Sequence, residues 1–146
     1  MSVQTSAHAD PKLVAGLRLV VGRLARRLRQ QAGGEVTPSM HSAMVSVERL
    51  QPVPLGELAA VERVQPPTIT KLVAKLEDLG YVVREADGRD RRIARVRLTP
   101  DGVRHLAQSR KRKDAYLAER LRRLDPGDRK LLEQALPVLE RLVGDE

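Results

Sequence analysis

Residues 80–102 read GYVVREADGRDRRIARVRLTPDG and predict a β-hairpin with a basic tip. The two runs that favour strands are residues 82–85 and residues 93–98. In the second run, apolar side chains alternate with arginines: Ala94, Arg95, Val96, Arg97 and Leu98. A period of two is typical of a strand with one buried face. We therefore expect one face of the hairpin to pack on the protein, while the polar tip between the runs faces solvent or a partner.

The overall charge points to a nucleic-acid partner. The chain has 146 residues, enough for one domain with a substantial core, and its 27 Lys and Arg exceed its 19 Asp and Glu to give a net charge of +8. Such an excess fits nucleic acid or, less often, an acidic membrane surface. Phe and Trp are absent and there are only two tyrosines, which disfavours proteins that stack single-stranded bases on aromatic rings. Double-stranded DNA is therefore the expected partner.

Composition disfavours several other kinds of site. There is no cysteine, which excludes structural disulfides, thiolate metal sites and cysteine redox sensing. His8, His41 and His105 are far apart in sequence, so no metal or other cofactor is expected. No apolar run approaches the roughly 18 residues that cross a bilayer, and residues 1–10 lack the apolar segment of a signal peptide. We expect a cytoplasmic protein with no membrane attachment.

Helix-start signals lie on both sides of the hairpin. Residues 1–10 read as a disordered tail, and a helix with one apolar stripe is expected from Pro11 until Gly33-Gly34. The first of three further helices should end near Leu50, the second should end near Leu124, and the third should be kinked or interrupted at Pro137. Each of the three starts with an N-cap residue followed by proline at the first helical position: Thr37-Pro38, Thr99-Pro100 and Asp125-Pro126.

The segment before the hairpin reads as two short helices joined by a turn. Residues 52–54 are expected to be an extended break, residues 55–62 a helix and residues 63–65 a turn. A second helix then opens at Pro66-Pro67 and carries an apolar stripe that ends near Gly80, the expected C-terminal cap. We expect a mainly α protein with a small β-hairpin wing (α+β), in which residues 53–99 form a winged helix-turn-helix.

The second helix of such a motif enters the DNA major groove with its N-terminal residues nearest the bases. Threonine can contact phosphates, base edges or a thymine methyl group, and lysine suits guanine or phosphate. Four side chains of these two types lie off the apolar stripe of this helix: Thr68, Thr70, Lys71 and Lys75. The alternative is a surface helix with a solvated polar face. The preceding helix and the following basic hairpin favour the DNA-binding interpretation.

The tip of the hairpin suits the adjacent minor groove, where arginine is favoured. The tip, Asp87 to Arg92, carries Arg89, Arg91 and Arg92, and Asp90 lies among these arginines. A carboxylate is unfavourable beside phosphates, so Asp90 is expected to orient an arginine through a charge-assisted hydrogen bond. The alternative is a solvated turn with a local ion pair of little energetic value.

Four segments together resemble the MarR family of winged-helix transcriptional regulators: LGELAA at 55–60, PPTITKLVAKLEDLGY at 66–81, DGRDRR at 87–92 and VRLTPDG at 96–102. The resemblance covers residues 11–143 and implies a homodimer that acts as a repressor on a pseudo-palindromic operator. It implies a single domain over residues 11–146, in which residues 11–32 and 100–143 form the dimer interface. It also implies that Thr68, Thr70 and Lys71 face the major groove, while Arg92 enters the minor groove.

Two positions depart from the pattern of the family. Arg63 stands where glycine is usual, so it must either adopt a strained backbone or let the preceding helix run on. Gln65 stands where a capping Ser or Thr is usual. Because glutamine caps poorly, we expect Gln65, beside Pro66, to face DNA instead. Both departures leave the start of the recognition helix open.

Relatives in this family bind small phenolic or other anionic ligands between the dimer helices and the DNA-binding lobe, so the resemblance implies a ligand pocket. In this sequence the pocket would draw on Leu17, Arg18, Met40, His41 and Met44. The alternative is favoured: His41 and the methionines are ordinary core or interface residues, because methionine commonly fills gaps in apolar packing.

The expected function is that of a sequence-specific, dimeric transcriptional regulator. A non-specific or architectural DNA-binding protein is the alternative that the charge of +8 supports. An enzyme has little support, because the sequence shows no catalytic set, phosphate-binding loop or cofactor motif. The nearest candidate pair, Asp101 and His105, has the spacing of an ordinary surface pair on a helix. A scaffold that binds only protein would leave the arginine tip unexplained.

Overall fold

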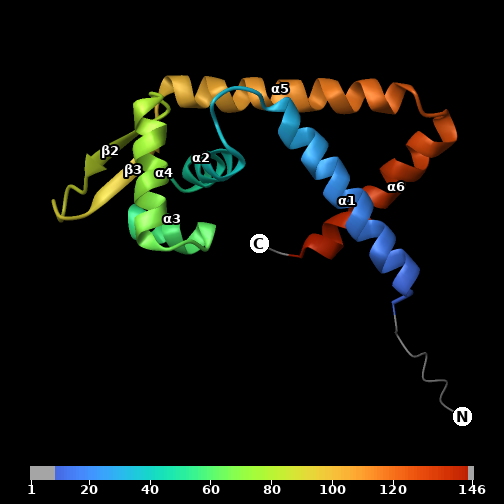
Figure 1. Ribbon diagram of the computed structural model, residues 1–146, viewed down its shortest axis with the longest axis horizontal. Helices are drawn as coiled ribbons and strands as arrows, with labels where there is room; N and C mark the ends of the chain where they lie inside the picture. Colours follow the sequence, from blue (N-terminus) through green and yellow to red (C-terminus); the bar gives the residue numbers. More distant parts are fainter. Residues whose placement is uncertain (1–8, 145–146) are drawn as a thin grey trace, which may run out of the picture.

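The computed structural model describes residues 9–144 and shows a mainly helical chain with one small sheet (Figure 1). The helices are α1 (Pro11–Gln31), α2 (Pro38–Leu50), α3 (Leu55–Glu62), α4 (Pro66–Asp78), α5 (Pro100–Arg122) and α6 (Pro126–Val143). The strands are β1 (Val53–Pro54), β2 (Val82–Ala86) and β3 (Ala94–Leu98). The expected fold class is confirmed. Most of the tail expected at residues 1–10 lies outside the described residues.

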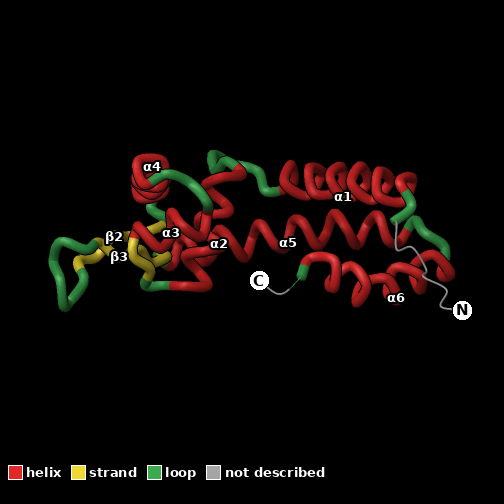
Figure 2. Tube along the Cα trace, turned by 90° about the horizontal axis from the view of Figure 1, so that it is seen from below, coloured by secondary structure: helices red, strands yellow, loops and turns green. Residues whose placement is uncertain are grey.

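The chain divides into a compact lobe and two outlying helices, which α5 connects. α2, α3, α4 and the sheet pack together at one end of α5, whereas α1 and α6 lie toward its other end (Figure 1). Seen from below, α1 and α6 flank α5 on opposite sides (Figure 2). Long α5 therefore belongs to both parts of the molecule.

The hydrophobic core lies in the lobe and in the first half of α5. Its fully buried side chains include Met44, Ile69, Val96 and Leu106, which come from α2, α4, β3 and α5. By contrast, α1 and α6 contribute no buried residue. Most of their large apolar residues are exposed instead, for example Leu142, which is 66% exposed. The lobe thus has its own core, and the outlying helices do not.

Capping explains where the helices begin, as the sequence predicts. α1 opens with Asp10, whose carboxylate accepts the backbone N–H of Lys12 at 2.9 Å. The three caps that the sequence predicts each accept a backbone N–H from the first turn of their helix: Thr37 from Met40, Thr99 from Gly102 and Asp125 from Asp128. In all four helices proline follows the cap, where its missing N–H leaves no unpaired donor.

Of the two outcomes expected at Pro137, a kink or an interruption of the last helix, the interruption does not occur. α6 continues from Pro126 to Val143 with Pro137 inside it. Proline at this position removes the hydrogen bond to the carbonyl four residues earlier, at Glu133. Both residues lie on the exposed part of α6, and the helix persists on either side of Pro137.

The sheet contains one strand that the sequence does not predict. The expected hairpin is confirmed, because β2 and β3 pair antiparallel from Val82 opposite Leu98 to Ala86 opposite Ala94. The segment expected to be an extended break instead supplies β1, whose Val53 lies opposite Val96 and makes β3 the central strand. A strand of two residues is too short to show a period of two, so only its partner strand identifies it.

Candidate nucleic-acid interface

The start of α4 needs no side-chain cap. Gln65 is the N-cap residue but makes no capping hydrogen bond through its side chain. Pro66 and Pro67 have no N–H to satisfy, and the next two amides, of Thr68 and Ile69, both donate to the carbonyl of Gln65, at 2.9 and 3.2 Å. The recognition helix therefore begins at Pro66, and the exposed side chain of Gln65 is not committed to capping.

The two faces of α4 are clearly divided. Ile69, Val73 and Leu76 are buried in the core. The polar side chains that the sequence assigns to DNA are all exposed: Thr68, Thr70, Lys71 and Lys75. The hydroxyl group of Thr70 donates to the carbonyl of Pro66 at 3.0 Å, so its proton is used within the helix. Toward DNA this residue offers its methyl group and an acceptor lone pair.

Arg63 settles how the turn between α3 and α4 is made. It adopts the left-handed conformation, with φ 55° and ψ 43°, so α3 stops at Glu62 instead of running on. The N–H of Arg63 bonds the carbonyl of Ala60 at 3.1 Å, and the N–H of Val64 bonds the carbonyl of Ala59 at 3.0 Å. These bonds satisfy the end of α3 and turn the chain into α4.

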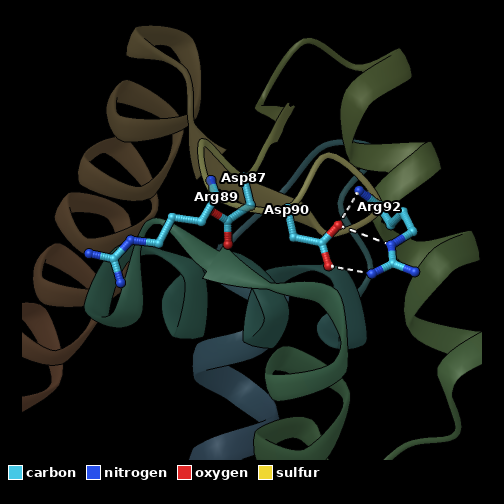
Figure 3. Close-up of polar contacts among 4 residues, drawn as sticks. All are labelled: Asp87, Arg89, Asp90 and Arg92. Atoms are coloured by element: carbon cyan, nitrogen blue, oxygen red, sulfur yellow. Dashed lines mark hydrogen bonds and ion pairs between the residues drawn. The ribbon is translucent and has the colours of Figure 1, made fainter.

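The wing consists of β2, β3 and the loop between them, and Asp90 holds Arg92 at its tip (Figure 3). The backbone N–H and the Nε of Arg92 donate to Asp90 Oδ1 at 3.0 and 3.1 Å, and its Nη2 donates to Oδ2 at 3.2 Å. The side-chain and then the backbone hydrogen bonds from Arg92 lower the pKa of Asp90 from its ordinary value of 3.8. The side chain of Arg92 nevertheless remains 91% exposed, so a guanidinium of fixed orientation faces outward.

Arg89 and Arg91, the other two arginines of the loop, are exposed as well. Figure 3 shows Arg89 pointing away from Arg92, on the opposite side of the loop. Arg89 and Arg92 therefore suit separate contacts better than one shared contact. The wing is joined to α4 through Arg84 of β2, whose Nε lies 2.6 Å from Glu77 Oε1. The helix and the wing are thus neighbouring parts of one surface element.

Asp87 is a further acidic residue of the wing, to which the sequence pattern assigned no role. Its carboxylate accepts the N–H of Arg89 at 3.0 Å and the Nε of Arg95 at 3.1 Å. The local signal was present, because Asp87-Gly88-Arg89 repeats the spacing of Asp90-Arg91-Arg92. The partner on β3 could not be read from that spacing.

The residues expected to line a ligand pocket do not share one cavity in this chain. Leu17 and Arg18 line a cavity of about 520 Å³ between α1 and α6. Met40 lines a different hollow beside Lys75, and Met44 is fully buried in the core. His41 lines a third cavity, of about 50 Å³, together with Lys113.

His41 and Lys113 join α2 to α5. Their Nε2 and Nζ atoms are 3.2 Å apart, so His41 Nε2 accepts from the ammonium group and Nδ1 carries the ring proton. Burial, followed by the nearby charge of Lys113, lowers the pKa of His41 from 6.5. Burial, followed by the charge of Arg110, likewise lowers the pKa of Lys113. The imidazole is therefore held in its neutral form at the junction of the lobe and the outlying helices.

The pair considered for catalysis does not form. Asp101 pairs with Arg104, while the ring of His105 stacks on Tyr81 with 4.6 Å between ring centroids. Within residues 9–144, no cluster of three or more His, Asp or Glu could hold a metal ion. In the same range, no helix combines the length and apolarity needed to cross a bilayer.

Known proteins match the chain over nearly its full length. Residues 36–94 match the MarR family. An uncharacterised HTH-type transcriptional regulator of Mycobacterium leprae is 33% identical over 138 residues, which are 94% of this chain and 96% of the relative. A Pseudomonas aeruginosa structure described as a transcriptional regulator superposes with a TM-score of 0.83 at 36% identity, covering 92% of this chain and 96% of that one. A mutant of Staphylococcus aureus MepR bound to an oligodeoxyribonucleotide gives a TM-score of 0.71 at 14% identity, covering 90% and 97% of the two chains. The resemblance predicted from the sequence is confirmed, and the chain belongs to the MarR family of DNA-binding transcriptional regulators.

Proposed function

We propose that this regulator acts as a homodimeric repressor on a pseudo-palindromic operator. The observation that carries the proposal is the Arg92 guanidinium, which Asp90 holds outward on a wing that adjoins the exposed polar face of α4. An ordered arginine at this place suits a narrow minor groove, while a helix with exposed Thr and Lys suits the major groove. The MepR mutant bound to an oligodeoxyribonucleotide shares this fold.

A second copy of the chain would account for the uncovered apolar faces of α1 and α6. Leu13, Leu131 and Leu142 are 59%, 63% and 66% exposed, and α1 and α6 contribute nothing to the core. Contiguous apolar surface of this kind is rare on a soluble monomer. In a two-fold dimer the two recognition helices would lie about 34–36 Å apart, one turn of DNA.

Each polar residue of the surface has a distinct proposed role. Arg89 and Arg91 bind phosphates, and Arg92 enters the minor groove. The N-cap residue and five residues of α4 face the major groove: Gln65, Pro66, Thr68, Thr70, Lys71 and Lys75. Specificity then depends mainly on α4, whereas the wing contributes affinity and placement.

Footprinting on the DNA that flanks its own gene tests the proposal. We expect a protected palindrome at moderate salt, with Arg92→Ala weakening binding about 10-fold and reducing the preference for A·T pairs at the site flanks. Lys71→Ala should change the preferred half-site. Arg129→Ala, an exposed arginine at the start of α6, is the matched control and should bind as the wild type does. The surface is wrongly assigned if neither Arg92→Ala nor Lys71→Ala alters binding.

A non-specific DNA-binding protein is the second candidate, because the net charge of +8 suffices for salt-dependent binding to any duplex. Competition between the protected duplex and random duplex separates the two. A preference of about 10³-fold or more supports the operator proposal, and equal competition supports non-specific binding.

Release by a small anionic or phenolic ligand extends the proposal. At the junction of α1, α2 and α5, Arg29, His41 and Lys113 line one cavity without a carboxylate. Its volume of about 50 Å³ is below the roughly 150 Å³ that accommodates benzene, so a ligand would have to displace the α1–α2 linker. That displacement would couple binding to the position of the lobe. A panel of aromatic carboxylates should weaken the gel shift, and no effect at millimolar concentration would contradict this extension.

A further inference from the structure

The loop of the wing, residues 87–93, contains two carboxylates with different surroundings. Asp90 lies at the tip with Arg92, whereas Asp87 lies at the root, where β2 ends (Figure 3). The side chain of Asp87 is only 12% exposed, against 35% for Asp90 and 91% for Arg92. Asp87 is thus a largely covered acidic residue in a loop that otherwise faces solvent.

The surroundings of Asp87 tie the loop to the sheet. Its Oδ1 accepts the N–H of Arg89 at 3.0 Å, and its Oδ2 accepts Nε and Nη2 of Arg95 at 3.1 and 3.0 Å. Arg95 belongs to β3, the central strand, and lies opposite Glu85 of β2 and Pro54 of β1. The carboxylate therefore connects the loop of the hairpin to the central strand of the sheet.

Backbone bonds carry this constraint from the root to the tip. The N–H of Asp87 donates to the carbonyl of Ile93 at 2.8 Å, and the N–H of Ile93 donates to the carbonyl of Asp90 at 3.0 Å. Asp90 in turn holds Arg92. The position of the Arg92 guanidinium thus depends on a continuous series of contacts that begins at Arg95.

We propose that Asp87, paired with Arg95, is a positioning residue that orders the wing before DNA binds and so directs Arg92 into the groove. Neither residue of this pair needs to touch DNA. A loop that is already ordered loses less conformational entropy on binding, which strengthens the complex. This inference rests on the proposed contact between the wing and DNA.

Charge alone predicts the opposite effect of removing Asp87. A carboxylate near the DNA backbone repels phosphates, so neutralising it would strengthen binding if electrostatics were its only role. If Asp87 positions the wing, neutralising it weakens binding instead. The sign of the change in affinity therefore separates the two roles.

The test measures the affinity of the full-length protein by fluorescence anisotropy, on a duplex that the wild type selects from a randomised pool. We expect Asp87→Asn to weaken binding about fivefold and to flatten the A·T preference at the flanks. The matched control is Glu85→Gln, which also removes a carboxylate from the wing; Glu85 lies in β2, and its contact with Arg97 is long, at 3.7 Å. This control should bind as the wild type does or more tightly.

A double-mutant cycle shows whether Asp87 acts through Arg92. In an Arg92→Ala background, Asp87→Asn should cause less than about a twofold further loss. An undiminished loss in that background, or unchanged or tighter binding by Asp87→Asn alone, overturns the inference. If Asp87→Asn fails to fold, Arg95→Gln replaces it; because this variant also removes a cation, its effect is judged by whether the loss shrinks in the Arg92→Ala background. If Arg92→Ala itself has no effect, the proposed contact between the wing and DNA is wrong; if only Asp87→Asn and Arg95→Gln have none, this inference alone fails.

Discussion

Arg63 is held in a backbone conformation that residues other than glycine seldom adopt. Its φ of 55° places it in the left-handed region, which costs an L-residue with a side chain about 1–2 kcal/mol. The conformation persists because the amides of Arg63 and Val64 satisfy carbonyls at the end of α3, and because Val64 packs against the core. The strain is therefore balanced by the turn that it makes possible.

Replacing Arg63 by glycine and by alanine isolates this strain. Glycine removes the steric cost of the left-handed backbone. Its greater freedom in the unfolded chain lowers the stability by about 0.4–1 kcal/mol, which offsets part of that gain. Arg63→Gly should therefore be more stable than Arg63→Ala by about 0.5–1 kcal/mol. Urea unfolding at one fixed protein concentration measures the difference. Equal stability of the two variants would show that the backbone at residue 63 is relaxed.

His41 makes the stability of the protein depend on pH. Burial and the charge of Lys113 lower its pKa below 6.5 in the folded chain, and burial lowers the pKa of His105 in the same direction. Below about pH 6.5 the unfolded chain therefore binds more protons than the folded one, so the free energy of unfolding falls on acidification and is fully retained above that pH. Asp87 and Asp90 do not contribute there, because their pKa values are lowered from 3.8.

The substitution His41→Gln removes one titrating ring and keeps an acceptor for Lys113. We expect the fall in unfolding free energy between about pH 7.5 and 5.5 to become smaller, with His105 responsible for part of what remains. Urea titrations across this range check the slope. An unchanged slope would mean that His41 is protonated equally well in the folded and unfolded chains.

At the scale of elements, the start of α5 is docked on the backbone that enters β2. Thr99 caps α5 by accepting the N–H of Gly102 at 3.0 Å, and its hydroxyl donates to the carbonyl of Gly80 at 2.6 Å. The N–H of Thr99 donates to the carbonyl of Tyr81 at 3.0 Å. A Cβ atom on Gly102 would lie 2.1 Å from that same carbonyl oxygen. Glycine is thus required at the end of the Leu-Thr-Pro-Asp-Gly segment because there is no room for a Cβ atom, and not because of an unusual φ.

Gly102→Ala is accordingly expected to destabilise the protein by about 1–3 kcal/mol, because backbone must move to admit the methyl group. Gly22→Ala is the matched control, since nothing lies within 4 Å of a Cβ atom at that position of α1. In an open helix interior, alanine should stabilise by about 0.5–1 kcal/mol. Thermal denaturation compares the two, and similar melting temperatures would contradict the close approach of α5 to Tyr81.

At the scale of the whole molecule, the two ends of α5 have different sources of stability. The lobe buries a continuous core, whereas α1 and α6 enclose an apolar cavity of about 520 Å³ that includes Leu17 and Leu142 in its lining. Burying one leucine contributes about 1.5–3 kcal/mol. The outlying helices therefore gain most of their stability only when another surface covers them, as the proposed dimer would.

Leu142→Asp tests that assembly. In a two-fold dimer the change occurs twice and removes about 4 kcal/mol, which raises the dissociation constant roughly 10³-fold. We expect sedimentation to show monomers and DNA affinity to fall. Val45→Asp, at an exposed apolar residue of α2, is the control and should leave the sedimentation unchanged. A variant at Leu142 that remains dimeric would place the interface elsewhere.

The sequence alone determined the features that depend on near neighbours. N-caps followed by proline fixed three helix starts, and the alternation around Val96 identified the strand that became β3. Capping and strand periodicity depend on a few neighbouring residues, so they can be read from a single sequence. The motifs of the wing and of the recognition helix also sufficed for the family.

Which distant groups come into contact could be learned only from the three-dimensional structure. It paired β1 with β3, joined Asp87 to Arg95, and distributed the expected ligand residues over separate cavities. It also kept α6 continuous through Pro137 and forced Arg63 into a left-handed turn. Such outcomes depend on the summed free energy of packing and hydrogen bonding across elements, which can exceed local preferences of about 1 kcal/mol and leaves no periodic trace in the sequence.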